Sequence, residues 1–426
     1  MTPASPDRAE TRLQAFSRDV RALPRTAWVV YAGTFINRFG GFVLTFLVLI
    51  LVQRGYTPAE AGVAASAYGV GSVGAAAVGG HLADRIGRRR SIALSMFSAA
   101  AVMLLLWRAE SLPAIVALAA LAGVTAELYR PAAAALLADV TPVGRRVVTF
   151  ALYRTAVNAG FALGPAMAGY FATRSTAVIF VGDALTCVLY GLLVLVAVPK
   201  SFDRPAPRAE AAEAGAKRER GPSALQLIAA DRALLGVLAA ATALAFVYHQ
   251  STVTLALEVD ARGLSTDSFG FLMSLNGALC LLLELPAAAV TARLPAWMPM
   301  AVGAVLTGVG FGATGLAPTL PVLALTVVVW TLGEIVHSPV VAAFMADLAP
   351  RGFQGRYQAA LGFTHAAGLV LSPALGPALF GWSRPGLWAL CAVLGVGAGL
   401  TYAVLGRARH VRTVEAELKA VEMPGD

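Results

Sequence analysis

The sequence predicts an all-α membrane protein in which twelve transmembrane helices form two pseudo-symmetric six-helix bundles. Three observations support this fold class: the composition, the number of long apolar segments, and an internal repeat. Hydrophobic residues make up 58% of the 426 residues, whereas Asp, Glu, Lys and Arg make up only 13%. A water-soluble chain of this length could not bury so much apolar surface, so most of that surface must face lipid.

Twelve segments of roughly 20 mainly apolar residues are each long enough to cross a bilayer as a helix. Runs this long and this apolar cannot be the alternating strands of a barrel, and a helix satisfies its own backbone hydrogen bonds in lipid. Six segments fall in each half of the chain. In order, they cover residues 27–53, 58–80, 92–107, 113–138, 147–171, 175–198, 233–257, 268–292, 298–316, 320–346, 357–380 and 385–406.

The two halves of the chain repeat each other with an offset of 208 residues and without gaps. Asp139 lies in the sequence ADVTP, and Asp347 lies in the related sequence ADLAP. We therefore predict an N-terminal bundle over residues 1–199, a polar cytoplasmic linker over 200–226, and a C-terminal bundle over 227–426. Duplicated membrane chains are typical of transporters, whose site lies where the halves meet. The same offset carries Gly55 onto Gly263, Gly62 onto Gly270, Gly69 onto Gly277, Pro131 onto Pro339, Gly160 onto Gly368 and Pro165 onto Pro373.

Positive charge is concentrated on one side of the predicted membrane. The formal net charge is +9, and most Lys and Arg residues lie in the N-terminal segment, the linker, the C-terminal tail and the loops on the same side. The positive-inside rule therefore predicts a multi-pass protein of the cell membrane with both termini in the cytoplasm. It also explains the basic charge without a nucleic-acid partner. The opposite loops hold only Arg54, Arg108, Arg174, Arg262 and Arg384.

The sequence shows no arrangement of residues that is typical of an enzyme active site. The three cysteines, Cys187, Cys280 and Cys391, all fall within apolar segments, which favours packing over a disulfide or a metal site. No nucleotide loop or nucleophile-and-base arrangement stands out. We therefore expect no enzymatic activity, no cofactor and no metal, with a transmembrane proton gradient as the energy source. We expect a monomer whose partners are the lipid bilayer, protons and a small-molecule substrate.

The loop between the second and third spans carries the motif that is most specific for a family. Residues 80–90 read GHLADRIGRRR, which resembles the signature G-x-L-A-D-R-x-G-R-R of the major facilitator superfamily. The resemblance implies the twelve-helix fold of that family, with this loop holding the cytoplasmic side closed. We expect its arginines to pair with Asp139 at the end of span 4; the alternative is that they only anchor the topology. The gate residues are then Gly80, Asp84, Arg85, Gly87, Arg88, Arg89 and Asp139.

Span 5 carries a second motif, GFALGPAMAG over residues 160–169. It resembles the antiporter motif G-x-x-x-G-P-x-x-G-G of the superfamily's drug:proton exporters, with Ala168 in place of one glycine. The resemblance implies export in exchange for protons; the alternative is ordinary close packing of small residues. The outer part of span 4 lacks the arginine that such exporters usually carry, so their coupling machinery cannot simply be transferred. The motif residues are Gly160, Gly164, Pro165 and Gly169.

Charged residues inside the spans are candidates for coupling, because such a group costs at least ~2.5–3.5 kcal/mol at membrane depth. Arg130 follows Glu127 by three residues, which places both on one helix face. We hypothesise that Glu127 is a protonatable carboxylate and that protonation releases Arg38 or Arg154, its expected partners on other helices. The alternative is a permanent structural ion pair.

Glu334 and His337 show the same spacing in span 10. We expect a substrate cavity between the bundles, and its predicted lining residues are Asn37, Phe35, Tyr129, Glu284, Glu334, His337 and His365. The sequence thus predicts proton-coupled export of a lipophilic drug or small metabolite by alternating access. The alternatives are proton-coupled uptake, flipping of a lipid-like substrate, and a non-transporting sensor with the same fold.

Overall fold

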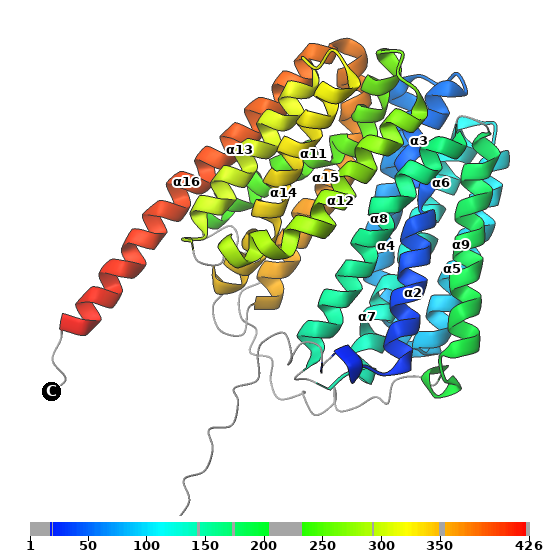
Figure 1. The fold of residues 1–426 in the computed structure, drawn as a ribbon, viewed down its shortest axis with the longest axis horizontal. Helices are drawn as coiled ribbons and strands as arrows, with labels where there is room; N and C mark the ends of the chain where they lie inside the picture. Colours follow the sequence, from blue (N-terminus) through cyan, green and yellow to red (C-terminus); the bar gives the residue numbers. More distant parts are fainter. Residues whose placement is uncertain are drawn as a thin grey trace, which may run out of the picture.

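A computed structural model describes residues 18, 20–142, 145–172, 175–203, 232–291, 294–348 and 354–422, and within these ranges the chain is helical with no strand (Figure 1). The first half contains α2 (Arg25–Gly40), α3 (Phe42–Gln53), α4 (Pro58–Ile86), α5 (Arg88–Arg108), α6 (Leu112–Glu127), α7 (Tyr129–Val140), α8 (Arg146–Ala172), α9 (Thr176–Ala197) and the 3-10 turn η2 (Lys200–Asp203). The second half contains α11 (Arg232–Ala261), α12 (Thr266–Thr291), α13 (Trp297–Thr314), α14 (Leu320–Leu348), α15 (Gln354–Trp382) and α16 (Arg384–Glu422).

Each of the twelve predicted spans coincides with one long helix or with two helices in succession, so the predicted fold class is confirmed. By length and composition, ten helical segments in the described ranges could cross a membrane, and α4 and α8 are not among them. These two helices are rich in glycine, alanine and polar residues, which lowers their hydropathy. Most of the predicted linker, residues 204–226, lies outside the described residues.

Two predicted spans are broken in the middle. Span 1 divides at Gly41 into α2 and α3, and the Asp183 carboxylate of α9 accepts a hydrogen bond of 3.1 Å from the Val43 N–H at the start of α3. Span 4 divides at Leu128 into α6 and α7. Pro131 explains this break, because it has no N–H for the Glu127 carbonyl and its ring crowds that carbonyl. The single helices expected for these spans are therefore wrong in detail.

The two halves touch mainly through α4 with α15 and α8 with α12, and also through α3 with α11. Gly62 of α4 lies on the carbonyl oxygen of Pro373, and a Cβ built on this glycine would be 2.1 Å from that oxygen. Gly270 of α12 lies on the Pro165 carbonyl oxygen of α8 in the same way, at 2.2 Å. The two contacts are related by the 208-residue repeat, so the duplication extends to the interface between the halves.

A second pair of contacts follows about two helical turns further along. A Cβ on Gly69 would be 2.8 Å from the Leu369 carbonyl oxygen, and one on Gly277 would be 2.7 Å from the Phe161 carbonyl carbon. Leu369 and Phe161 each precede a proline by four residues, so their carbonyls lack the usual helical partner. Only glycine lets two helix backbones approach this closely. We call these four glycine positions and their partners the far-end contacts.

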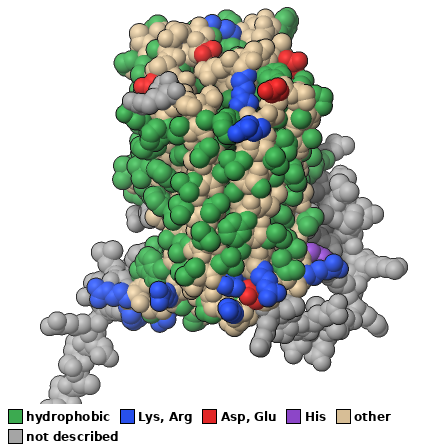
Figure 2. All heavy atoms as spheres, turned by 90° about the vertical axis from the view of Figure 1, so that its right-hand side faces the viewer, with side chains coloured by type: hydrophobic (Ala, Val, Ile, Leu, Met, Phe, Trp, Pro, Cys, Tyr) green, Lys and Arg blue, Asp and Glu red, His purple; other side chains and the backbone are tan. Residues whose placement is uncertain are grey.

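These contacts define two different ends of the molecule. They lie toward the end that carries the loops at residues 54–57 and 262–265, which we call the far end. The opposite, basic end carries Arg85–Arg90, Asp139 and Asp203. Figure 1 shows the helices of the two halves converging toward the far end and diverging toward the basic end. Figure 2 shows apolar side chains over the middle of one face with charged side chains near the two ends, as expected of a protein surrounded by lipid.

Candidate functional site

A cluster of three charged side chains lies next to both helix breaks. Glu127 is the last residue of α6, and its carboxylate accepts 2.8 Å from Nη1 of Arg130 and 3.4 Å from Nη2 of Arg38 on α2. The Glu127 side chain is only 12% exposed, whereas that of Arg130 is 55% exposed. The structure thus brings together three of the four residues that the sequence grouped. We call them the Glu127 cluster.

The other residues of the first half that were expected to line a cavity mostly pack instead. Tyr129 is fully buried, and its ring meets Tyr190 edge to face at 5.6 Å. The Asn37 amide is buried against the sulfur of Cys187, at 3.5 Å. Their assignment to the cavity is therefore wrong in this structure, because both side chains point into the first half. Phe35 is half-buried and stacks on Phe39.

An ion pair joins α8 of the first half to α12 of the second half. Arg154 of α8 pairs with Glu284 of α12, and the Asn158 amide donates a 2.9 Å hydrogen bond to the same carboxylate. The sequence analysis expected Arg154 to be a possible partner of Glu127, and this expectation is wrong, because Arg154 pairs with Glu284. The physical reason is that α8 packs along α12, which directs this arginine into the other half. The carboxylate of Glu284 is occupied by these two contacts, which hold α8 against α12, and Glu284 does not line the pocket described below.

The second half contains a cavity of about 490 Å³ between α11, α13, α14 and α15. Three of the predicted site residues, Glu334, His337 and His365, line it. Its other lining residues are Ala241, Leu244, Ala245, Tyr248, Thr307, Ser338, Val341, Leu361, Gly362 and Thr364. We call this cavity the pocket. It lies in the middle of the half and toward the basic end.

The carboxylate of Glu334 is held by neutral donors. The Asn276 amide donates to it at 3.0 Å, and the Tyr248 hydroxyl and Cys280 thiol also face it. The ring of His337 lines the same pocket, but its Nε2 atom is buried with no hydrogen-bond partner. The predicted pair of Glu334 and His337 thus shares a pocket.

The pocket faces the first half. His365 of α15 lines it and lies 5.0 Å, ring to ring, from His249. The Arg130 guanidinium is close enough to His365 for electrostatic interaction. Arg130, the exposed member of the Glu127 cluster, therefore lies on the side of the pocket that His365 lines.

Among the described residues, the partners of the loop at the basic end belong to the first half. Gly87 joins α4 to α5 with φ of 89°, and a Cβ there would be 2.5 Å from the backbone of Phe202. Arg88 bridges Asp84 at 3.2 Å and Asp139 at 3.1 Å. This last contact is the pairing expected from the sequence.

Three further residues of the predicted gate differ in their surroundings. The Arg89 side chain is buried and donates to Asp203 at 2.7 Å and to the Leu195 carbonyl. Arg85 is exposed, and Gly80 lies in the last turns of α4. The described partners of the loop all belong to the first half.

The glycines of the span 5 motif place α8 between two neighbours. A Cβ on Gly160 would be 2.6 Å from the Cβ of Arg38, and one on Gly164 would be 2.4 Å from the Phe39 carbonyl oxygen. Gly169 and Pro165 instead contact α12 of the other half. One face of α8 therefore packs against α2 next to the break in span 1, and another face packs against α12 at the far-end contacts.

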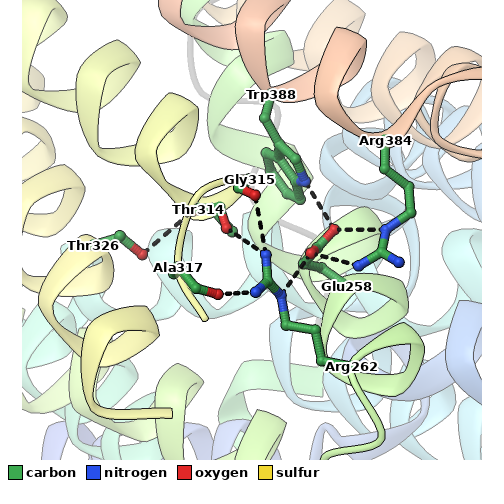
Figure 3. A network of polar contacts seen from close by, with 8 residues as sticks. All are labelled: Glu258, Arg262, Thr314, Gly315, Ala317, Thr326, Arg384 and Trp388. Carbon is green, nitrogen blue, oxygen red and sulfur yellow. Dashed lines mark hydrogen bonds and ion pairs between the residues drawn. The ribbon is translucent and has the colours of Figure 1, made fainter. Parts of the chain in front are cut away.

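Sequence reasoning missed a polar network at the far end (Figure 3). Glu258 is 1% exposed and accepts hydrogen bonds from Nε of Arg262 at 2.7 Å and Nη2 of Arg384 at 2.8 Å. Trp388 Nε1 adds a third bond at 2.9 Å. The signal in the sequence is the four-residue spacing of Glu258 and Arg262, which favours an ion pair on one helix. Arg262 also donates to the carbonyls of Thr314, Gly315 and Ala317, so the network joins α11, α13 and α16.

The comparison with family models gives one decisive result. The model of the Major Facilitator Superfamily matches residues 30–265 and 250–423. The chain belongs to this superfamily. It is therefore a multi-pass membrane transporter protein rather than an enzyme, as the sequence predicted.

Three relatives are similar to this chain at low sequence identity. The MFS-type transporter YqjV of Bacillus subtilis is 25% identical over 367 residues, covering 84% of this chain and 88% of YqjV. The Na(+), Li(+), K(+)/H(+) antiporter of Planococcus maritimus is 26% identical over 381 residues, covering 82% and 89%. The quinolone resistance protein NorA of Staphylococcus aureus is 27% identical over 151 residues, covering 35% and 38%.

Among solved structures, a peptide transporter POT in complex with alafosfalin has a TM-score of 0.75 and 16% sequence identity, covering 92% of this chain and 99% of that chain. A likeness at this identity shows the fold alone. The comparisons thus establish a major facilitator transporter.

Proposed function

We propose that this transporter exports small lipophilic cations across the cell membrane in exchange for protons, by alternating access. The observation that carries the proposal is the environment of Glu334. Among the described carboxylates within the spans, Glu127, Glu258 and Glu284 each pair with at least one guanidinium, and Asp183 accepts a hydrogen bond from the Val43 N–H and does not line the pocket. Glu334 has only neutral described partners, such as Asn276.

A carboxylate without a countercharge is costly inside a membrane. Either a proton or the cationic group of a substrate removes that cost, and the two exclude each other at one carboxyl group. Release of a substrate on one side and of a proton on the other then links their movements. The pocket of about 490 Å³ lies within the usual size range of about 300–1,000 Å³ for sites of small organic ligands.

The span 5 motif supports export, and the charge distribution supports the orientation of the protein in the membrane. The positive-inside rule places the basic end in the cytoplasm, so the arrangement in Figure 1, with the halves joined at the far end, is inward-facing. The resemblance of residues 160–169 to the antiporter motif and the similarity to NorA support export. A membrane proton gradient supplies the energy.

The Glu127 cluster then has a different part in the cycle from the one first hypothesised. Two arginines already neutralise Glu127, whereas Glu334 has none among the residues described, so we assign the exchanged proton to Glu334. Glu127 holds α2 and α6 together through Arg38, next to the breaks in both spans. The loop around Arg88 and Asp139 serves as the cytoplasmic gate.

Exchange of monovalent metal cations for protons is a second candidate, favoured by the similarity to the Planococcus maritimus antiporter. The pocket provides one carboxylate, Glu334, and the hydroxyls of Thr307 and Thr364 in its lining already bond to carbonyls of their own helices. Hard cations prefer several oxygen ligands. We therefore rank this candidate second.

The test uses purified protein in liposomes that contain a pH-sensitive dye. A proton gradient is imposed, and proton flux is recorded on addition of a lipophilic quaternary ammonium ion, Na⁺ or K⁺. We expect flux with the ammonium ion for the wild type, loss of flux for Glu334→Gln, and retained flux for Glu127→Gln if that variant stays folded. Wild-type flux with Na⁺ or K⁺ alone would favour the second candidate. Full activity of Glu334→Gln would refute the assignment of the proton.

A further inference from the structure

The internal repeat links the pocket to the arginines of the first half. At the 208-residue offset, Arg130 maps onto Ser338 and Arg154 maps onto Gly362. Both Ser338 and Gly362 line the pocket. The lining thus has two small residues at the positions where the first half has long side chains that end in a guanidinium group.

The second half nevertheless keeps a carboxylate beside these positions. Glu334 lies one position before the repeat equivalent of Glu127, and it lines the pocket with only neutral described partners. In the first half, Glu127 accepts a 2.8 Å hydrogen bond from the guanidinium of Arg130, which lies one turn further along the same span. The pocket therefore has the carboxylate of such a pair without its guanidinium.

The pocket also has room for a guanidinium and a second group to bind it. A Cβ built on Gly362 would meet nothing within 4 Å, so the space beside this glycine is open. Ser338 is exposed, and its hydroxyl bonds to no described residue. It follows Glu334 by four residues on α14, which places both side chains on one helix face with their Cβ atoms about 5–6 Å apart. The two residues thus offer two hydrogen-bond acceptors to the same pocket.

Most other polar groups of the lining are already bonded or turned away. The Thr307 and Thr364 hydroxyls donate to carbonyls of their own helices at 2.9 and 2.8 Å. The Tyr248 hydroxyl faces Glu334. The Nε2 atom of His337 is buried, so it does not face the pocket.

His365 is the remaining exposed polar residue of the lining, and it lies on α15. Its ring packs on that of His249, with 5.0 Å between the centroids, and it interacts electrostatically with Arg130. The Glu127 cluster contains two guanidiniums and one carboxylate, so this side of the pocket faces net positive charge. A cation in the pocket is therefore directed away from His365 and toward α14.

We infer that the pocket selects lipophilic cations whose charged group is a guanidinium or an amidinium, and that Ser338 sets this preference. One N–H of the planar cation meets the Glu334 carboxylate, and a second N–H, which points in another direction, meets the Ser338 hydroxyl oxygen. A guanidinium is more weakly hydrated than an ammonium group, so it loses less on entering an apolar pocket. The inference rests on the proposed function, because it takes the pocket as the substrate site.

The test compares two cations with the same 3-phenylpropyl chain, which suits the apolar lining formed by Leu244, Val341 and Leu361. One cation carries a guanidinium group and the other a trimethylammonium group. The two head groups have the same charge and the same number of heavy atoms, but only the guanidinium has N–H donors. Dissociation constants are measured by calorimetry with the full chain in lipid nanodiscs.

The wild type should bind the guanidinium at least about tenfold more tightly, the lower end of the range for one hydrogen bond to a charged group. Ser338→Ala should lower this ratio about tenfold through the guanidinium alone, whereas Ser338→Thr, which keeps a hydroxyl, should retain most of it. Thr364→Val is the matched control and should keep the ratio, because the Thr364 hydroxyl is already bonded to the Leu361 carbonyl. His365→Phe should change both affinities by the same factor.

Three results would overturn the inference. The first is a wild type that lacks the preference or binds neither cation. The second is a Ser338→Ala protein that keeps the wild-type ratio. The third is an equal loss of the ratio in Thr364→Val or His365→Phe, since the hydroxyl of Ser338 would then have no role of its own.

Glu334→Gln separates this inference from the proposed function. It should weaken the binding of both cations and abolish the proton flux that the trimethylammonium ion causes in liposomes. If that flux required Glu334 while the wild type did not prefer the guanidinium, the proposed exchange would stand and the inference would fall. If the preference depended on Ser338 while Glu334→Gln kept full flux, the role of Ser338 would stand and the proton assignment would fail.

Discussion

Replacing Gly62 by alanine tests whether the far-end contacts are a gate. The added Cβ would lie 2.1 Å from the Pro373 carbonyl oxygen, whereas ordinary contact begins at about 3.4 Å. The obstacle is helix backbone, which cannot swing aside as a side chain can. The change therefore forces α4 and α15 apart by about 1 Å at this level.

Overpacking of this kind costs about 1–3 kcal/mol. The cost applies only while the halves are joined at the far end, because a conformation with that end open has no Gly62 contact to disturb. The equilibrium between the two conformations should therefore move by about 5- to 150-fold toward the open far end. Gly270→Ala should have an effect of similar size, since its Cβ would lie 2.2 Å from the Pro165 carbonyl oxygen.

The assay is pulsed electron spin resonance between labels at Gln53 and Thr266, whose side chains meet across the halves at 3.5 Å. Gly62→Ala should transfer a large share of the short distances to a longer population. Gly74→Ala is the matched control on the same helix, because a Cβ there would meet nothing within 4 Å. Identical distance distributions for the two variants would refute the argument that these glycines control closure.

Three further sets of substitutions test separate contacts. Glu258→Gln should lower the melting temperature, because loss of one partner of a buried ion pair costs about 3 kcal/mol or more; an unchanged Tm would make the far-end network dispensable. Gly87→Ala should destabilise the protein more than Gly55→Ala, as both have positive φ but only Gly87 has backbone within 3 Å of a Cβ; equal Tm values in thermal melts would contradict this. Arg154→Glu and Glu284→Arg should each reduce proton flux in liposomes at least tenfold, and the double variant should recover part of it; a double variant as inactive as the singles would argue against direct pairing.

The spans were predictable because each apolar run was long enough to cross a bilayer, but the two breaks differ in how local their causes are. The break at Leu128 follows from Pro131, which lies three residues away and removes a helical hydrogen bond. The break at Gly41 combines a local cause, the Gly40–Gly41 pair, with a distant one, because Asp183 of another helix accepts a hydrogen bond from the Val43 N–H. A cause that arrives from a distant segment leaves no periodic signal at the break.

The same distinction explains the candidate site. The contact of Glu127 with Arg130 follows from a three-residue spacing on one helical stretch, and the sequence predicted it. The pairing of Arg154 with Glu284 depends on how α8 lies against α12 in the other half, so depth in the membrane alone led to the wrong partner. The unpartnered Nε2 of His337 depends on α13 and α16 together, and no spacing in α14 reveals it.

The internal repeat explains why the pocket lies in the second half. Arg130 and Arg154 map, at the 208-residue offset, onto Ser338 and Gly362, and both of these small residues line the pocket. The second half therefore has space where the first half has long cationic side chains. The far-end contacts, in contrast, recur in both halves with nearly the same geometry. The far-end contacts on the two sides of the interface must open and close together, so they need the same geometry in both halves. A single exchange site has no such requirement, and here one half carries the charged side chains while the other has room for a substrate.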